Sequence, residues 1–129
     1  MNSPSRNPAI LLVEDEPDIL IILHRIMRDL TGGYDIVTVN GGQEALGVMA
    51  ERDCRLLITD YNMPGMTGTE LTQKVKELYP AIKVIIITAY ATPDVERKAR
   101  SAGVDYFLTK PFSLDRLEQI IKEVLEQLA

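Results

Sequence analysis

The segment Ala9-Ile10-Leu11-Leu12-Val13-Glu14-Asp15 decides how this chain folds, because an apolar run ends there in two acids. The run is apolar at every position, which is typical of a central strand in a parallel sheet. If later runs of the same kind are its neighbours, the polar residues that follow them meet at one edge, where α/β sheets bind ligands. Those runs are Leu56–Thr59 before Asp60, Val84–Ile87 before Thr88, and Tyr106–Thr109 before Lys110.

Strand and helix patterns alternate along the chain, which predicts a parallel sheet with helices on both faces. The expected fold class is α/β: a doubly wound, flavodoxin-like (βα)5 fold with strand order 2-1-3-4-5. In that order the first and third strands are neighbours, so Asp15 and Asp60 face each other at the switch point. The predicted strands are Ala9–Val13, Tyr34–Val39, Arg55–Thr59, Ile82–Ile87 and Asp105–Leu108.

The apolar faces of the predicted helices differ in width. The helix that begins at Thr92-Pro93 has a thin face, so it is a candidate for movement or for binding a partner. The last helix, which begins after Ser113, has a stripe that includes Leu114, and Ile120 and Leu125 widen it enough to suggest a partner surface. The helix capped by Thr67 and Glu70 is expected to bury Leu78.

The bulk composition narrows the class of protein. A length of 129 residues predicts one domain over residues 9–129, after a flexible lead-in over residues 1–8. A net charge of −5 argues against a nucleic-acid surface. No apolar stretch approaches the roughly 18 residues of a membrane span, so no membrane contact is expected. The single cysteine, Cys54, excludes an internal disulfide and suits the reducing cytoplasm, where we expect the protein to reside.

Three carboxylates at the expected edge, from Glu14, Asp15 and Asp60, predict a divalent cation site. Held close together without a cation, they would repel one another and take up protons. Mg²⁺ prefers oxygen ligands and keeps several waters, and Mn²⁺ is a potential substitute. Asp15 and Asp60 would be direct ligands, whereas the longer Glu14 would act through water.

Asp60 is the best candidate nucleophile, because carboxylates form aspartyl-phosphate intermediates. Lys110 would supply a positive charge to the phosphoryl group. Thr88 has a hydroxyl at the neighbouring strand end that could donate to a phosphoryl oxygen. Pro111 forces a turn after Lys110, and a cis bond would aim the lysine inward, but the residues alone leave cis or trans open.

These residues resemble the receiver domain of response regulators in two-component signalling systems. The resemblance covers about Ala9 to Leu128. It rests on four motifs: Val13-Glu14-Asp15-Glu16-Pro17, Thr59-Asp60-Tyr61-Asn62-Met63-Pro64-Gly65-Met66-Thr67-Gly68, Ile87-Thr88-Ala89 and Leu108-Thr109-Lys110-Pro111-Phe112. Many receivers have Asp where this chain has Glu14, which leaves the metal role of Glu14 open.

The resemblance implies that Asp60 accepts a phosphoryl group from a phosphohistidine on a sensor histidine kinase or phosphotransfer protein. It implies Mg²⁺ on Asp15, Asp60 and the backbone carbonyl of Asn62, and a cis bond before Pro111. A domain of this kind catalyses its own phosphorylation and dephosphorylation and turns over no separate metabolite. The partner kinase, the pathway, and whether the domain stands alone or belongs to a larger regulator stay open.

The resemblance also implies how the signal leaves the site. Thr88 moves toward the phosphoryl group, and Tyr106 turns inward behind it. The face formed by the fourth helix, fifth strand and fifth helix would then bind an effector, or a second copy of the chain. Asn62 and Tyr90 occupy positions that tune the lifetime of the acyl phosphate.

Three other functions compete with this interpretation. An unphosphorylated interaction module on the same fold is disfavoured by the intact set of Asp15, Asp60, Thr88 and Lys110. A turnover phosphatase with an aspartyl nucleophile commonly carries a second acid where this chain has Asn62. A flavin electron carrier needs a phosphate-cradling loop after the first strand, where Glu14 and its neighbours would repel a phosphate.

Overall fold

The computed structural model describes residues 7–30 and 32–128, which form five strands and five helices. Most of the expected lead-in, residues 1–6, lies outside the described residues. No helix of the described chain is long and apolar enough to cross a membrane. In chain order the elements are β1 (Ala9–Val13), α1 (Pro17–Leu30), β2 (Asp35–Val39), α2 (Gly42–Glu51), β3 (Cys54–Asp60), α3 (Gly68–Leu78), β4 (Lys83–Thr88), α4 (Pro93–Ala102), β5 (Tyr106–Thr109) and α5 (Leu114–Leu128).

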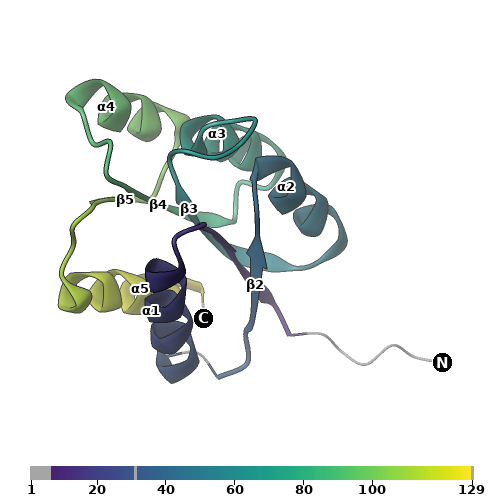
Figure 1. The fold of residues 1–129 in the computed structure, drawn as a ribbon. Coiled ribbons are helices and arrows are strands. Elements are labelled where there is room, and N and C mark those ends of the chain that lie inside the picture. The colour runs from purple at the N-terminus through teal and green to yellow at the C-terminus, as the bar shows by residue number, and fades with distance from the viewer. Residues whose placement is uncertain (1–6, 31, 129) are drawn as a thin grey trace.

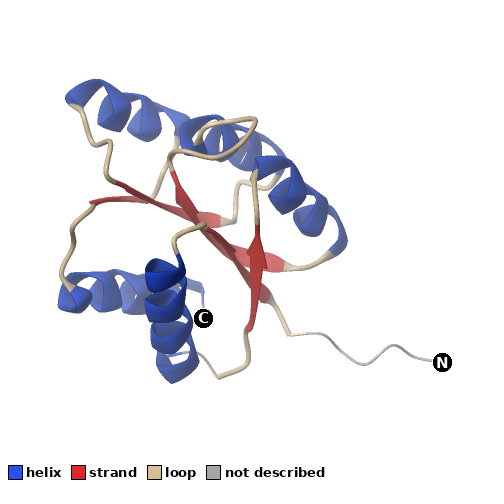
Figure 2. Ribbon diagram, in the orientation of Figure 1, coloured by secondary structure: helices blue, strands red, loops and turns tan. Residues whose placement is uncertain are grey.

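The strands form one parallel sheet in the order β2-β1-β3-β4-β5, which confirms the predicted topology. Figures 1 and 2 show α1 and α5 on one face of this sheet and α2, α3 and α4 on the other. Because strand order reverses between β1 and β3, their carboxyl ends open a crevice between the loops that follow them. Both Glu14 and Asp60 lie at these ends.

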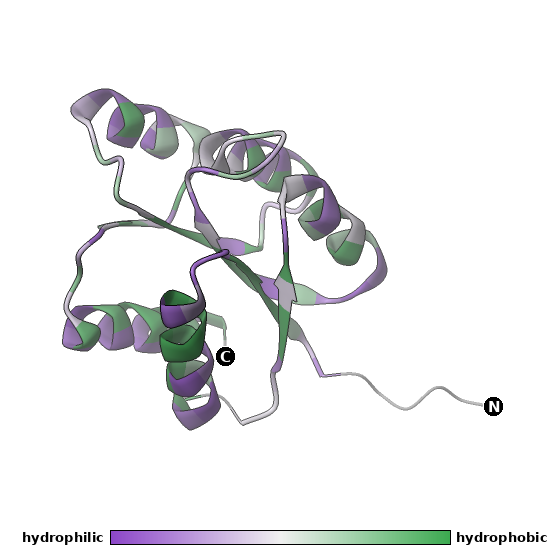
Figure 3. Cartoon of the chain, in the orientation of Figure 1, coloured by the Kyte–Doolittle hydropathy of each residue, from purple (hydrophilic) through white to green (hydrophobic). Residues whose placement is uncertain are grey.

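Two apolar clusters, one on each face, hold the helices to the sheet. Successive residues of a strand point to opposite faces. In β4, Val84 and Ile86 pack toward α2, α3 and α4, whereas Ile85 and Ile87 pack toward α1 and α5. Figure 3 shows the strands mostly in the hydrophobic colour, as expected for a sheet covered on both sides.

Several side chains on the helices differ from expectation. Ile120 is 1% exposed and belongs to the α1–α5 cluster, so its assignment to a partner surface was wrong. Conversely, Leu78 and Leu114 are 63% and 54% exposed, although each was expected in a buried stripe. Both lie at a helix end, Leu78 as the last residue of α3 and Leu114 as the first residue of α5. Among the described residues of α4, Ala99 alone is buried, so the face is as thin as predicted.

The loop after Asp60 is held tightly against the strand. The amide of Gly68 donates to the carbonyl of Tyr61 at 2.7 Å. A Cβ on Gly68 would lie 2.5 Å from the carbonyl oxygen of Asp60, so a larger residue would displace the backbone there. The predicted capping box of Thr67 and Glu70 starts α3 directly afterwards. The loop therefore fixes the backbone that carries Asp60.

Candidate phosphoryl and metal site

The polar residues that follow the strands meet as predicted. Carboxylate oxygens of Glu14, Asp15 and Asp60 lie within 4.8 Å of one another. The amide of Lys110 donates to the carbonyl of Thr88 at 2.8 Å, which extends the β4–β5 pairing by one step and brings Lys110 to the same edge. Four strand ends thus converge on one place because the sheet is parallel.

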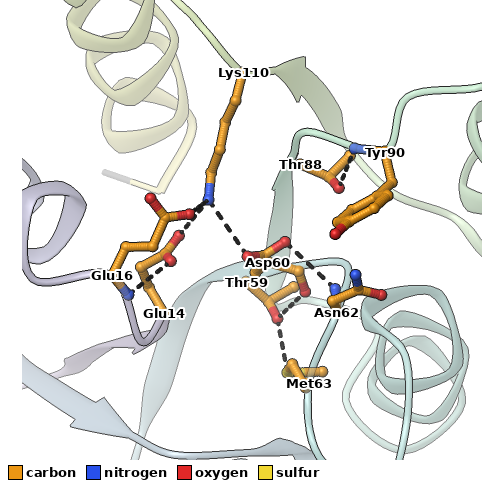
Figure 4. A network of polar contacts seen from close by, with 9 residues as sticks. All are labelled: Glu14, Glu16, Thr59, Asp60, Asn62, Met63, Thr88, Tyr90 and Lys110. Carbon is orange, nitrogen blue, oxygen red and sulfur yellow. Dashed lines mark hydrogen bonds and ion pairs between the residues drawn. The ribbon is translucent and has the colours of Figure 1, made fainter.

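Lys110 lies at the centre of this cluster (Figure 4). Its ammonium is 3.1 Å from Glu14 Oε1, 2.8 Å from Glu16 Oε1 and 3.3 Å from Asp60 Oδ2. The side chain of Lys110 is 11% exposed and that of Glu14 is 3% exposed. The lysine therefore partly neutralises three acids, of which Glu14 is almost fully shielded from water and Glu16 is 56% exposed.

The charges at this edge shift one another's proton affinity. Burial raises the pKa of the Glu14 carboxyl above its ordinary value, although bonds from the Glu16 amide and Lys110 act in the opposite direction. Burial by itself would lower the pKa of Lys110, but its bonds to Glu16 and Glu14 and the charge of Asp60 raise the pKa well above its ordinary value. The surrounding acids thus favour the cationic form of Lys110, whereas burial disfavours the charged form of Glu14.

The two carboxylate oxygens of Asp60 have different partners. Oδ2 faces Lys110, and Oδ1 accepts a bond from the amide of Asn62 at 3.3 Å. The buried hydroxyl of Thr59 donates to the carbonyl of Asp60 at 2.8 Å and also contacts Met63 Sδ at 3.2 Å. Asp60 is 13% exposed, so its carboxylate is oriented but still accessible.

A small hollow of about 190 Å³ opens beside Asp60. Its oxygen-rich lining suits a hard cation that keeps part of its water shell, so the residues present fit Mg²⁺. The lining residues are Val13, Glu14, Asp15, Asn40, Asp60, Asn62, Met63 and Pro64.

Thr88 and Tyr90 lie on the other side of Asp60 from the acids that follow β1 (Figure 4). Thr88 is fully buried, and its hydroxyl oxygen accepts a bond from the amide of Tyr90 at 2.9 Å. Tyr90 is 57% exposed at the rim. The threonine hydroxyl keeps a proton with which it can donate to an anionic group near Asp60.

Tyr106 does not lie behind Thr88, and this corrects the expected pairing of the two. Thr88 pairs in register with Thr109, so Thr88 shares its face of the sheet with Thr109 and Phe107. Tyr106 points to the opposite face, where its hydroxyl donates to Glu123 of α5 at 3.0 Å. Phe107, packed against the cluster that includes Ala99 of α4, is the aromatic residue on the Thr88 face.

The peptide bond between Lys110 and Pro111 is cis, as the resemblance implied. Two residues near the site were missed in the sequence. Glu16 contacts Lys110, and the signal was a third acid directly after Glu14 and Asp15. Asn40 lines the hollow, and the signal was its place as the polar residue that follows β2, like those that follow the other strands.

Comparisons with known proteins agree with this geometry. The family model described as response regulator receiver domain matches residues 10–122. The chain is 38% identical over 126 residues to the transcriptional regulatory protein GlrR of Escherichia coli K12, covering 97% of the chain but 28% of that relative. It is 30% identical over 119 residues to sporulation initiation phosphotransferase F of Bacillus subtilis, covering 92% of the chain and 94% of that relative.

The fold is similarly matched by a solved structure. The CheY-like response regulator receiver domain protein of Methanospirillum hungatei aligns with a TM-score of 0.80 and 31% identity, over 94% of this chain and 96% of that one. Receiver domains bind Mg²⁺ at an acidic pocket and interact with sensor histidine kinases and effector domains. The chain belongs to the response regulator receiver domain family of two-component signal transduction.

Proposed function

We propose that Asp60 is the phosphoacceptor of this receiver domain. The observation that carries the proposal is the convergence on Asp60 of a lysine that is 11% exposed and two further carboxylates at the carboxyl edge of the sheet. A nucleophile in such a place is oriented before the reaction, so catalysis is mostly positioning and charge stabilisation.

In the proposed transfer, a carboxylate oxygen of Asp60 attacks the phosphorus of a phosphohistidine on the partner. A phosphorus–oxygen bond forms while the phosphorus–nitrogen bond breaks, and the electron pair stays on the imidazole, which takes a proton from solvent. Lys110 donates to the phosphoryl oxygens as their charge shifts. In the later hydrolysis, water attacks phosphorus and releases phosphate from Asp60.

The metal site would consist of Asp15 and Asp60 as direct ligands, with the backbone carbonyl of Asn62 as a third. Glu14, which is almost fully buried and already bonded to Lys110, would act through a water. When bound, Mg²⁺ offsets the charge of the acids and of the phosphoryl group. Mn²⁺ has similar ligand preferences and would substitute for it.

The conformational change that follows phosphorylation would begin at Thr88 and would pass to the residues on the same face of the sheet. A phosphoryl group on Asp60 attracts the Thr88 hydroxyl, and Phe107 packs on the same face as Thr88. Because α4 has a thin buried face, a change there shifts populations easily. The α4–β5–α5 face would bind an effector or a second copy of the chain, and Asn62 and Tyr90 would tune how long the acyl phosphate lasts.

A phosphohistidine partner has to dock close to Asp60 and Lys110. An apolar hollow adjoins Lys110 between α1 and the loop before α5, and Ile19, Ile22, Phe112 and the exposed Leu114 line it. We assign this hollow to the partner kinase or phosphotransfer protein, since it borders the reacting group. The domain would extend over residues 9–129 and act in the cytoplasm.

The test is labelling by acetyl phosphate in the presence of Mg²⁺, followed by mass spectrometry of the intact chain. We expect wild type to gain one phosphoryl group and Asp60→Ala to gain none, while Asp53→Ala, which removes an exposed acid at the far edge, is labelled normally. Stoichiometric labelling of Asp60→Ala would contradict the assignment. Mg²⁺ binding by wild type without any labelling would favour the unphosphorylated interaction module.

A further inference from the structure

We propose that Glu16 is a positioning residue that competes with the incoming phosphoryl group for the ammonium of Lys110, and so restrains phosphorylation of Asp60. The inference rests on the proposed function, in which Lys110 binds the phosphoryl group carried to Asp60. It concerns a residue outside the predicted site, whose carboxylate makes the shortest of the three contacts to Lys110.

The ammonium of Lys110 is already fully engaged. A lysine has three N–H donors, and Nζ of Lys110 contacts three carboxylates. The side chain is 11% exposed, so water has little access to it. A phosphoryl oxygen can therefore receive a bond from Lys110 only if one of the carboxylates gives up its own.

Burial decides which carboxylate is released. Asp60 is the nucleophile and has to stay in place. Glu14 is 3% exposed, and its second oxygen accepts from the amide of Glu16 at 3.1 Å, so freeing it would leave a buried charge unpaired. Glu16 is 56% exposed, and water can replace Lys110 as its partner at little cost. Glu16 is thus the exchangeable ligand of Lys110.

Glu16 reaches Lys110 from the side of Glu14 (Figure 4). Its backbone has separate roles: the amide bonds to Glu14, and the carbonyl accepts from the amide of Leu20 at the start of α1. A substitution of the side chain leaves both bonds in place. Removing only the carboxylate charge therefore isolates its competition for Lys110 from the folding of α1.

The experiment compares Glu16→Gln with wild type, using acetyl phosphate and Mg²⁺, with beryllofluoride as a phosphoryl mimic. Competition weakens binding without altering the reacting geometry, so the variant should lower KM for acetyl phosphate about threefold at unchanged kcat, the size expected for a half-exposed ion pair. The dissociation constant of beryllofluoride should fall by the same factor. Glu16→Asp, which keeps the charge on a shorter arm, should lie between the two.

Asp18→Asn is the matched control, because it removes the same charge two residues further on, in the first turn of α1, at an exposed position that is not among the described partners of Lys110. An equal gain in Asp18→Asn, or an unchanged or higher KM in Glu16→Gln, would overturn the inference while leaving Asp60 as the phosphoacceptor. Failure of wild type to be labelled at all would overturn the proposed function and the inference together.

Discussion

Two lysines at opposite edges of the sheet illustrate two uses of an ion pair. Lys76 of α3 lies at the amino edge, where Nζ donates to the carbonyl of Ile82 at 2.7 Å and to Asp105 Oδ2 at 2.8 Å. The same oxygen of Asp105 accepts from the amide of Val84 at 2.8 Å. Lys110 lies at the carboxyl edge and contacts Glu14, Glu16 and Asp60.

The difference between the edges is their charge balance. At the amino edge one acid, Asp105, has Lys76 as a close partner and Lys83 at 3.8 Å, so its charge is amply compensated. At the carboxyl edge Lys110 faces three acids, and Asp15 adds a fourth nearby. A balanced pair ties elements together, whereas an excess of closely spaced negative charge favours a site that takes up cations.

The largest expected effect concerns the two lysines themselves. Lys110→Met should slow labelling by acetyl phosphate on the order of 100-fold, because it removes a preorganised donor to the phosphoryl group. Lys76→Met should leave the labelling rate unchanged, since Lys76 lies at the far edge. Rates of labelling at saturating Mg²⁺, followed by mass spectrometry, check both. Equal losses in the two variants would mean that the edges do not differ in function.

Neutralising an acid should have opposite effects on stability at the two edges. Without Mg²⁺, Asp105→Asn should lower the free energy of unfolding by about 2 kcal/mol, because Lys76 loses its carboxylate in a half-buried place. Asp60→Asn should raise it by about 1 kcal/mol, because repulsion among the acids is relieved. Urea unfolding measures both changes.

Mg²⁺ provides the control for this pair. At 100 times its dissociation constant, Mg²⁺ should stabilise wild type by about 2.7 kcal/mol. It should stabilise Asp105→Asn equally and Asp60→Asn much less, and a chelator should remove the effect. A chain whose unfolding is insensitive to Mg²⁺ would show that the acids at the carboxyl edge are compensated in another way.

A smaller effect is expected for the hydrogen bond between Tyr106 and Glu123, in which a neutral hydroxyl, and no cation, faces a carboxylate. Burial and the bond to Glu123 raise the pKa of Tyr106 above its ordinary value of about 10. The resulting stability is fully present below that ordinary value and is lost as pH rises through the higher pKa of the folded state. Glu123→Gln removes an anionic acceptor, so the pKa of Tyr106 should fall toward the ordinary value.

Tyrosinate absorbance during an alkaline titration measures this shift, with Tyr106→Phe as the blank for the other tyrosines. A titration of Tyr106 that is the same in wild type and in Glu123→Gln would show that the bond between them has no influence on the tyrosine. In that case the hydrogen bond between Tyr106 and Glu123 would differ from the ion pairs at both edges of the sheet, where the charge of the acid has an effect.

The strand order and the convergence of Asp15, Asp60 and Lys110 could be predicted because several local signals agree. Apolar runs, helix caps and a parallel sheet together admit few topologies, and each polar residue lies at the end of a strand or within two residues of it. The capping box at Thr67 is a further signal that needs no tertiary information.

The prediction failed where the outcome depends on one residue of register. Tyr106 and Phe107 are adjacent aromatics in a strand of four residues, and which of them shares a face with Thr88 follows from the pairing of Thr88 with Thr109. The contact of Glu16 with Lys110 depends on how the loop after β1 turns. The exposure of Leu114 depends on which residues of α5 pack against the rest of the protein, and helical periodicity does not show where along the helix that packing begins.

The sheet also divides the interior into two compartments. Phe107 and Ala99 belong to one, and Tyr106 with α5 belongs to the other. If a change begins at Thr88, we expect it to reach first the residues on the face of the sheet that carries Phe107 and Ala99. A protein that binds α5 alone would therefore respond little to such a change, whereas a protein that binds both α4 and α5 would respond to it.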